Sequence, residues 1–221
     1  MYRINTHRAG VKKHYLTIEN VNDGKSETFC YYEKETQTVN RTSLIFIHGF
    51  SSDKNTWLNT IKNIPHNFHC IAIDMPGHGE TVGFSLEDLK ADRVIDKLKL
   101  FFDVLGLTRP MCLIGTSMGG SIVAMFAAKY PSYVKMICLL APVPPGGYCE
   151  TDAIRQIRSG MYDIILPRTH EQFYTTADTF AMKKIHCRHL LASQYLKTKL
   201  STIDQHKKIL QSAFENDYPN L

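Results

Sequence analysis

The stretch "LIGTSMGGSIV" at residues 113–123 places a serine between glycines, where an apolar run gives way to a helical pattern. Gly115, Ser117 and Gly119 form a G-x-S-x-G pattern directly after a short apolar segment and directly before a helix. A sharp turn from strand to helix forces its central residue into strained backbone angles that cost about 1–3 kcal/mol. Glycines two residues to either side let the backbone approach itself without a Cβ clash. The pattern predicts a serine hydroxyl lifted to a helix N-terminus, where negative charge is favoured.

The surrounding sequence alternates between strand and helix patterns. Short apolar runs rich in β-branched residues indicate strands buried on both faces of a parallel sheet, at residues 43–49, 69–77, 111–117 and 134–142. Two more strands, at 14–20 and 28–35, stand on either side of a turn at 22–25. Helical spacing covers residues 86–105, with Ser85 and Asp88 as a capping box and Gly106 as the C-terminal cap, and also residues 119–130, where Pro131 ends the pattern. The order predicts the α/β class, with a doubly wound, mostly parallel sheet.

The strand pattern ends at residue 142. We therefore expect two parts, an α/β core at residues 1–142 and a polar, mostly helical segment at residues 143–221. Because no further buried strand pattern follows, we expect the last strands of the sheet to be missing from this chain.

Composition narrows the class of protein. The chain has 221 residues, 43% hydrophobic and 21% charged, with a net charge of +5. No run of five like charges occurs, so we expect no nucleic-acid partner. Cys70, Cys112 and Cys138 lie inside apolar runs and are predicted to be buried free thiols in an intracellular, reducing compartment. The sequence shows neither a secretory signal nor an apolar stretch long enough to span a membrane.

A second segment, earlier in the chain, is predicted to contribute to the same site as the serine. An acyl-transfer site needs two backbone N–H groups that face the oxyanion, one from the residue after the nucleophile and one from an earlier loop. Met118 and Phe50 stand in those positions, since "IFIHGF" ends the strand pattern that starts at residue 43. The segment "IDMPGHGE" at residues 73–80 is interpreted as a structural turn.

The segments "SLIFIHGFSSDKNTW", "DMPGHGE" and "LIGTSMGGSIVAMFAAKYP" resemble the α/β-hydrolase fold family. Within it they are most similar to the membrane-associated monoacylglycerol lipases of the abhydrolase-domain-containing type. The resemblance implies Ser117 as nucleophile, the amides of Phe50 and Met118 as oxyanion hole, and residues from about 143 as a lid over the acyl chain. It implies a monoacylglycerol or related lipid ester as substrate, with no cofactor and no metal.

A serine nucleophile needs a histidine to take its proton and a carboxylate to orient that histidine, and in this fold both follow the serine in the chain. No strand pattern after the lid supplies them, so we expect the chain to lack its general base and to be inactive. Asp152 is the best substitute acid, and His48 and then His206 are the first candidate bases. All the aspartates and histidines after Ser117 are nevertheless interpreted as solvated lid surface: Asp152, Asp163, Asp178, Asp204, Asp217, His170, His186, His189 and His206. A metal site at His186, Cys187 and His189 lacks a second cluster to complete four ligands.

Two other functions stay open. A carbon–carbon bond hydrolase uses the same turn, and arginines facing the pocket (Arg155, Arg158 and Arg168) would favour its acidic substrates. A non-catalytic lipid-binding homologue is the other alternative. The apolar lid residues Met161, Ile164, Ile165 and Leu166 form either a peripheral contact with a membrane surface or a buried lid helix.

Overall fold

The computed structural model describes residues 2–19, 24–38, 41–107, 109–143, 151–180 and 189–215. The chain is divided into two compact units, residues 1–143 and residues 144–221.

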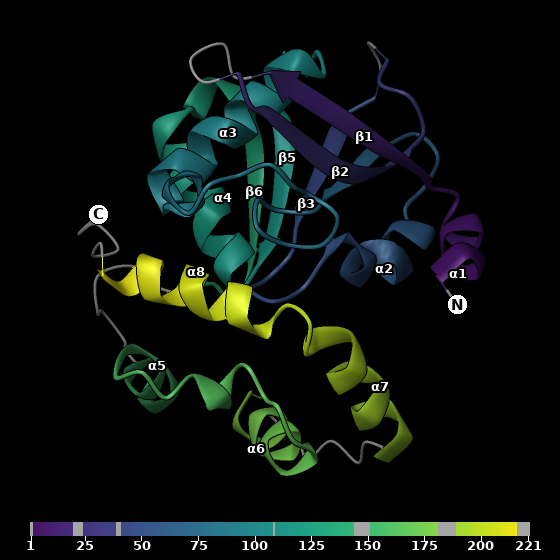
Figure 1. Ribbon diagram of the computed structural model, residues 1–221. Coiled ribbons are helices and arrows are strands. Elements are labelled where there is room, and N and C mark those ends of the chain that lie inside the picture. The colour runs from purple at the N-terminus through teal and green to yellow at the C-terminus, as the bar shows by residue number, and fades with distance from the viewer. Residues whose placement is uncertain are drawn as a thin grey trace. The chain divides into compact units, whose positions relative to one another are not determined.

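The first unit contains a six-stranded sheet (Figure 1). Its strands are β1 (Lys12–Glu19), β2 (Ser26–Lys34), β3 (Ser43–Ile47), β4 (His69–Ile73), β5 (Met111–Thr116) and β6 (Val134–Leu140), in the order β1-β2-β4-β3-β5-β6. The β1–β2 and β2–β4 pairs are antiparallel, and β4–β3, β3–β5 and β5–β6 are parallel. The predicted α/β class with a mostly parallel sheet is confirmed, and the carboxyl ends of β3, β4, β5 and β6 lie along one edge.

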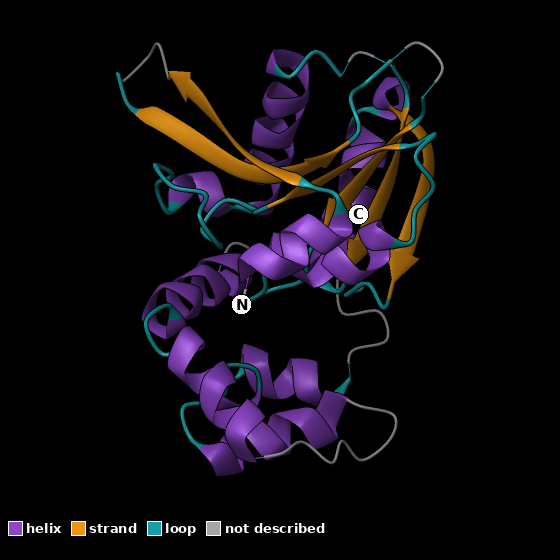
Figure 2. Cartoon of the chain, turned by 90° about the vertical axis from the view of Figure 1, so that its right-hand side faces the viewer, coloured by secondary structure: helices purple, strands orange, loops and turns teal. Residues whose placement is uncertain are grey.

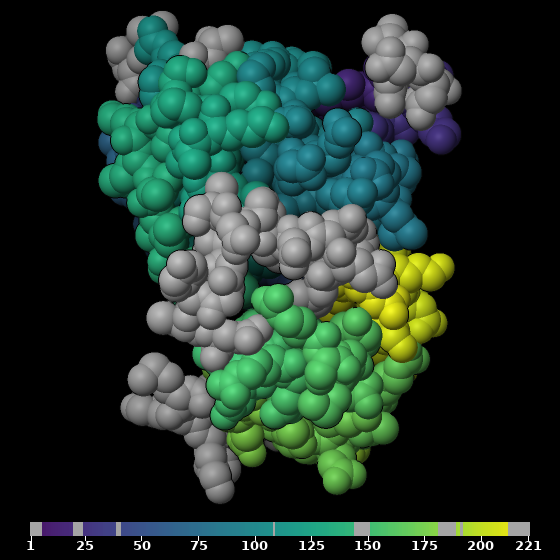
Figure 3. All heavy atoms as spheres, turned by 90° about the vertical axis from the view of Figure 1, so that its left-hand side faces the viewer, coloured from purple at the N-terminus to yellow at the C-terminus, as the bar shows by residue number. Residues whose placement is uncertain are grey.

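Helices cover both faces of this sheet (Figure 1). One face carries α1 (Tyr2–Ala9), the 3-10 turn η1 (Lys54–Trp57) and α2 (Leu58–Lys62). There Phe46 packs on Trp57 with ring centroids 5.2 Å apart. The other face carries α3 (Ala91–Val104) and α4 (Met118–Lys129), where Phe102 and Phe126 pack edge to face at 5.4 Å. This two-sided cover is the doubly wound arrangement that the alternating pattern predicts, and Figure 3 shows the α3 and α4 side in teal to green.

The prediction that residues 134–142 are buried on both faces is wrong for β6. Met136 is 58% exposed and Leu140 is 45% exposed, whereas β4 is buried along its whole length. In the described part of the sheet, β6 is an edge strand that pairs only with β5. Cys138 is exposed for the same reason, while Cys70 and Cys112 are buried as predicted.

The predicted helix at 86–105 begins later than its apolar spacing indicates. The capping pair forms, because Asp88 accepts hydrogen bonds from the Ser85 amide at 2.9 Å and hydroxyl at 2.5 Å. That pair closes the short 3-10 turn η2 (Glu87–Leu89) instead, and Lys90 is extended with ψ 144°. The helix proper starts at Ala91 and ends before Gly106, whose φ of 76° fits the predicted glycine cap.

Every element described in the second unit is helical (Figure 2). These are α5 (Asp152–Arg158), the 3-10 turn η4 (Tyr162–Ile164), α6 (His170–Phe180), α7 (His189–Lys199) and α8 (Ile203–Glu215). Ile157, Leu166, Leu196 and Ile209 are buried in this unit. None of the helices in the described ranges is long and apolar enough to cross a membrane.

Candidate functional site

Ser117 lies between β5 and α4 in a backbone conformation that is rare for any residue with a Cβ. Its φ is 51° and its ψ is −125°, and it caps the N-terminus of α4. Its N–H donates to the Leu140 carbonyl at 2.9 Å, and its own carbonyl accepts from the Gly120 N–H at 2.8 Å. Hydrogen bonds from the end of β6 and from the first turn of α4 therefore hold this conformation. The residue is half-buried, so it is not sealed in the core.

The two glycines of the pattern are required by close backbone contacts. A Cβ at Gly115 would come closer than 3.0 Å to the Gly119 carbonyl oxygen, and a Cβ at Gly119 would come closer than 3.0 Å to the His48 carbonyl oxygen. A Cβ at Gly49 would lie 3.2 Å from the Ser117 Cβ. The segment after β3 therefore runs directly against the Ser117 turn.

The two backbone amides predicted for the oxyanion hole come from these same segments. Phe50 follows Gly49, the residue that packs on Ser117. Met118 is the first residue of α4, where backbone N–H groups have no partner within the helix. A φ of 54° at Ser51, directly after Phe50, adds a second strained residue, which no local sequence pattern indicates.

His48, the first candidate base, is fully buried with its ring committed to the backbone. The Met75 N–H donates to Nε2 at 3.0 Å, so the ring proton is on Nδ1, which donates to the Gly49 carbonyl at 2.7 Å. Neither nitrogen is left to take a proton from Ser117. His48 therefore stabilises the backbone conformation of the segment after β3.

A buried ion network connects that segment to the turn after β4. Lys54 is 1% exposed, and its Nζ donates to Asp74 at 2.6 Å and to Glu80 at 2.9 Å. The Lys54 N–H donates to the other Asp74 oxygen at 2.7 Å, and the Glu80 N–H donates to Asp74 at 2.8 Å. These bonds agree with the interpretation of residues 73–80 as a structural turn. Lys54 itself was missed, because a lysine in the polar run "SSDKN" has the sequence signature of a solvated loop.

Charge in this network is balanced within the protein. Burial alone would lower the Lys54 pKa, but the carboxylates of Asp74 and Glu80 more than offset it and hold this pKa above its usual range. Burial would raise the Glu80 pKa, but hydrogen bonds from Tyr15, Lys13 and Lys54 bring it down to about 2. Cys30, Asp74 and Glu80 place metal-ligand atoms within 4.8 Å of one another. The Lys54 ammonium already binds both carboxylates, and Lys13 adds the second positive charge on Glu80, so this donor set does not fit a metal cation.

Two of the candidate acids in the second unit are ion-paired at its surface. Asp152 pairs with Arg155 at 2.9 Å, and Asp204 pairs with Arg168 at 2.6 Å. The prediction of a solvated surface is wrong for His206, which is 3% exposed on the side of α8 that also buries Ile203, Ile209 and Leu210. His186, Cys187 and Asp217 lie outside the described residues.

Another serine and two histidines meet between α6 and α7. The rings of His170 and His189 stack with centroids 4.0 Å apart, and His170 Nε2 lies 2.8 Å from the Ser193 hydroxyl. Ser193 lies inside α7, and its hydroxyl donates to the His189 carbonyl at 2.9 Å. A hydroxyl bonded back to its own helix has the geometry of a structural contact, so we assign no catalysis here.

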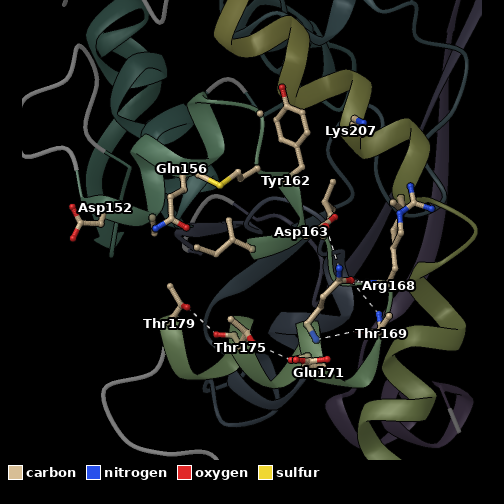
Figure 4. A pocket seen from close by; sticks show the side chains of 17 residues that line it. Asp152, Gln156, Tyr162, Asp163, Arg168, Thr169, Glu171, Thr175, Thr179 and Lys207 are labelled. Atoms are coloured by element: carbon tan, nitrogen blue, oxygen red, sulfur yellow. Dashed lines mark hydrogen bonds between the residues drawn. The ribbon is translucent and has the colours of Figure 1, made fainter.

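A hollow of about 1100 Å³ lies within the second unit (Figure 4). Its lining mixes acidic and basic side chains, among them Asp163, Arg168, Glu171 and Lys207. Gln172 donates to Asp163 at 3.0 Å and accepts from the Arg168 N–H at 2.7 Å. The described residues that line the hollow include no serine, cysteine or histidine, so none of them forms a pair of serine or cysteine nucleophile and histidine base.

Comparison with known proteins identifies the family. The sequence model of the alpha/beta hydrolase fold family matches residues 42–197, which include β3 to β6 and the Ser117 turn. The chain belongs to the alpha/beta hydrolase fold family. Human monoacylglycerol lipase ABHD6 is 40% identical over 115 residues, which is 52% of this chain and 34% of that protein. Monoacylglycerol lipase abhd6-B of Xenopus laevis is 31% identical over 131 residues, 59% of this chain and 39% of that protein.

Solved structures share the fold of this alpha/beta hydrolase. A membrane phospholipase A superposes with a TM-score of 0.81 and 21% identity, over 99% of this chain and 67% of that one. Carboxylesterase CesB from Bacillus subtilis superposes with a TM-score of 0.64 and 14% identity, over 96% of this chain and 65% of that one. The resemblance drawn from the sequence is confirmed. The matched segment spans about a third of the length of the curated mammalian relatives.

Proposed function

We propose that this alpha/beta hydrolase is a serine hydrolase of lipid esters, with Ser117 as the nucleophile. The observation that carries the proposal is the strained Ser117 turn, with φ 51°, against which the Gly49 segment packs. A strained backbone conformation persists only where the surrounding structure enforces it, and such conformations are common at active sites.

The proposed reaction uses one covalent intermediate. The Ser117 oxygen attacks the ester carbonyl, the bond to the alcohol breaks, and the alcohol leaves with a proton. Water then adds to the acyl-enzyme, the fatty acid leaves and the hydroxyl of Ser117 is restored. In both steps the backbone amides of Phe50 and Met118 hold the negative charge on the carbonyl oxygen.

The proposed substrate is a monoacylglycerol or a related lipid ester, and the second unit is proposed as its lid. The support is the similarity to monoacylglycerol lipases over about half of this chain. Peripheral contact with a membrane surface is part of this proposal. Of the apolar residues first considered for it, Met161 is 53% exposed, whereas Leu166 is 3% exposed and belongs to the interior of the second unit. Buried thiols at Cys30, Cys70 and Cys112 support an intracellular location.

The alternative of a carbon–carbon bond hydrolase has less support. It needs arginines available to an acidic substrate, but Arg155 and Arg168 are paired with Asp152 and Asp204. The alternative of a non-catalytic lipid-binding protein requires that Ser117 does not react covalently. The experiment below therefore separates it from the proposal.

The reactivity of Ser117 is also part of the proposal. Within the described ranges, no histidine is hydrogen-bonded to the Ser117 hydroxyl. We therefore propose that Ser117 in this 221-residue chain reacts slowly, with the oxyanion hole supplying most of the rate enhancement. Sites that lose a triad residue keep a rate of about 10³–10⁴ over water from the oxyanion hole and binding.

Covalent labelling tests the proposal. Incubation of the chain with a long-chain alkyl fluorophosphonate should form a Ser117 Oγ–P bond as the P–F bond breaks, and mass spectrometry should find one adduct per chain. Ser117→Ala should abolish the adduct, and excess monoacylglycerol should slow its formation. An adduct that persists in Ser117→Ala, or the absence of any adduct in the unaltered chain, would contradict the proposed nucleophile.

A further inference from the structure

The segment that carries Phe50 is anchored at both ends on one turn, residues 74–80. At its start, His48 Nε2 accepts from the Met75 N–H at 3.0 Å. At its end, Lys54 donates to both oxygens of Asp74, from its N–H at 2.7 Å and from its Nζ at 2.6 Å. The intervening residues 49–53 therefore span two fixed points on the same turn.

The Lys54 anchor is rigid and shielded from water. Lysine is almost never fully buried unless its charge is paired, and Lys54 is 1% exposed. Its Nζ also donates to Glu80 at 2.9 Å and lies 5.0 Å from the centre of the Tyr32 ring. Asp74 is held in turn, because its carbonyl accepts from the Thr81 hydroxyl at 2.7 Å. A flexible side chain is thus fixed by partners from two different segments, the turn at residues 74–80 and β2.

The segment between the anchors is strained. Ser51, the residue after Phe50, is 7% exposed and has a φ of 54°. A conformation of this kind costs about 1–3 kcal/mol in a residue other than glycine, and it relaxes when its surroundings stop enforcing it. Loss of the Lys54 anchor would therefore let the segment relax and move the Phe50 amide.

We propose that Lys54 is a positioning residue, whose ammonium fixes residues 49–53 through Asp74 so that the Phe50 amide meets the oxyanion formed on Ser117. The inference rests on the proposed function. Oxyanion donors must reach about 2.7–3.1 Å from the charged oxygen, so a small displacement of this loop weakens the donor.

The test separates reaction from binding in the labelling of the full chain by a long-chain alkyl fluorophosphonate. The inactivation rate constant kinact depends on how well the site stabilises the oxyanion, and the constant KI measures how tightly the probe binds before it reacts. The deciding variant is Lys54→Met with Asp74→Asn, because Lys54→Met alone leaves a buried unpaired carboxylate that is strongly destabilising. Complete loss of an oxyanion donor costs about 10²–10³-fold. We expect kinact to fall by about 10- to 100-fold, with KI unchanged within about twofold.

Lys13→Met is the matched control. Lys13 donates to Glu80 at 2.9 Å from the exposed side of the same network, and it makes no contact with Asp74. We expect both constants to stay at their original values in this variant. An unchanged kinact in the double variant would overturn the inference, as would an equal loss of kinact in Lys13→Met. The absence of a Ser117 adduct in the unaltered chain would instead overturn the proposed function, and this inference with it.

Discussion

At the scale of single residues, the site depends on positions where the backbone leaves no room for a side chain. Gly115 and Gly119 were predicted from their spacing alone, and both are within contact range of neighbouring backbone carbonyls. The positive φ of Ser51 and the burial of Lys54 were not predicted, because neither leaves a trace in the local sequence pattern. Both features depend on contacts between residues that are distant in the sequence, such as the contact between Lys54 and Asp74.

Gly119→Ala should therefore destabilise the chain far more than Gly120→Ala. A Cβ at Gly119 would come within 3.0 Å of backbone carbonyl oxygens of Ile47 and His48, which are fixed in the sheet edge. At Gly120 the Cβ would meet the Pro142 side chain at 3.1 Å, and alanine also favours the helix. We expect Gly119→Ala to lower the free energy of unfolding by about 1–3 kcal/mol, and Gly120→Ala to leave it within about 1 kcal/mol. Urea denaturation of both variants measures this, and equal effects would contradict the packing described at the turn.

At the scale of elements, the strand pattern predicted the central sheet well and its edge poorly. β3, β4 and β5 are covered on both faces, as their apolar runs indicate. The run in β6 is equally apolar, yet most of it is exposed. Apolar sequence alone does not say whether a strand has neighbours on both sides. The opposite edge, β1, carries Lys12 and Lys13, charges of the kind that protect a free edge, whereas the only lysine in β6 is Lys135.

Met136→Lys should reduce self-association of the chain. Met136 is 58% exposed on the β6 edge, and apolar edge strands template pairing between chains. Leu86→Lys is the control, because Leu86 is 50% exposed but lies outside the sheet. Light scattering over a concentration series should show a smaller particle size for Met136→Lys alone. The same improvement in both variants would show that general charge, and not the edge, is responsible.

The network around Glu80 links β1, η1 and the turn after β4, and it predicts a pH dependence. The Glu80 pKa is about 2 in the folded chain, against an ordinary value of 4.5. The folded state thus favours the ionised form, so its stabilisation is complete above about pH 4.5 and is lost as the pH falls toward 2. Glu80→Gln should lower the free energy of unfolding at pH 7 by about 0.5–1 kcal/mol and flatten its fall in this window. Urea denaturation from pH 7 to pH 2.5 tests this, and parallel curves for both chains would refute the assignment.

At the scale of the whole molecule, the sequence predicted the family, and it indicated a candidate nucleophile but not a complete catalytic apparatus. The G-x-S-x-G pattern needs only local backbone geometry, so it can be recognised within a few residues. An acid and a histidine are brought to a serine by tertiary structure, and their identity cannot be read from spacing. Asp152 and His206 illustrate this, since the former is exposed and ion-paired and the latter is buried in the second unit.

Ester turnover by the 221-residue chain should be close to background. A serine without its base contributes little, so Ser117→Ala should change the steady-state hydrolysis of a monoacylglycerol by less than about twofold. Release of fatty acid, followed over hours at high protein concentration, measures this rate. Robust turnover abolished by Ser117→Ala would show that an unrecognised group acts as the base.

We propose that the strained turn presents Ser117 as the nucleophile, and transfer of an acyl group from an ester to the chain is the direct measurement of that role. The chain is incubated with a large excess of a long-chain p-nitrophenyl ester. Its intact mass is measured over time, and peptide mapping then locates the acylated residue. Ser121→Ala is the control, because Ser121 lies on the next turn of the same helix and its buried hydroxyl donates to the Val143 carbonyl at 2.6 Å. We expect one slowly formed acyl group on Ser117, retained in Ser121→Ala and lost in Ser117→Ala. An acyl group on another residue, or no acyl group at all, would contradict it.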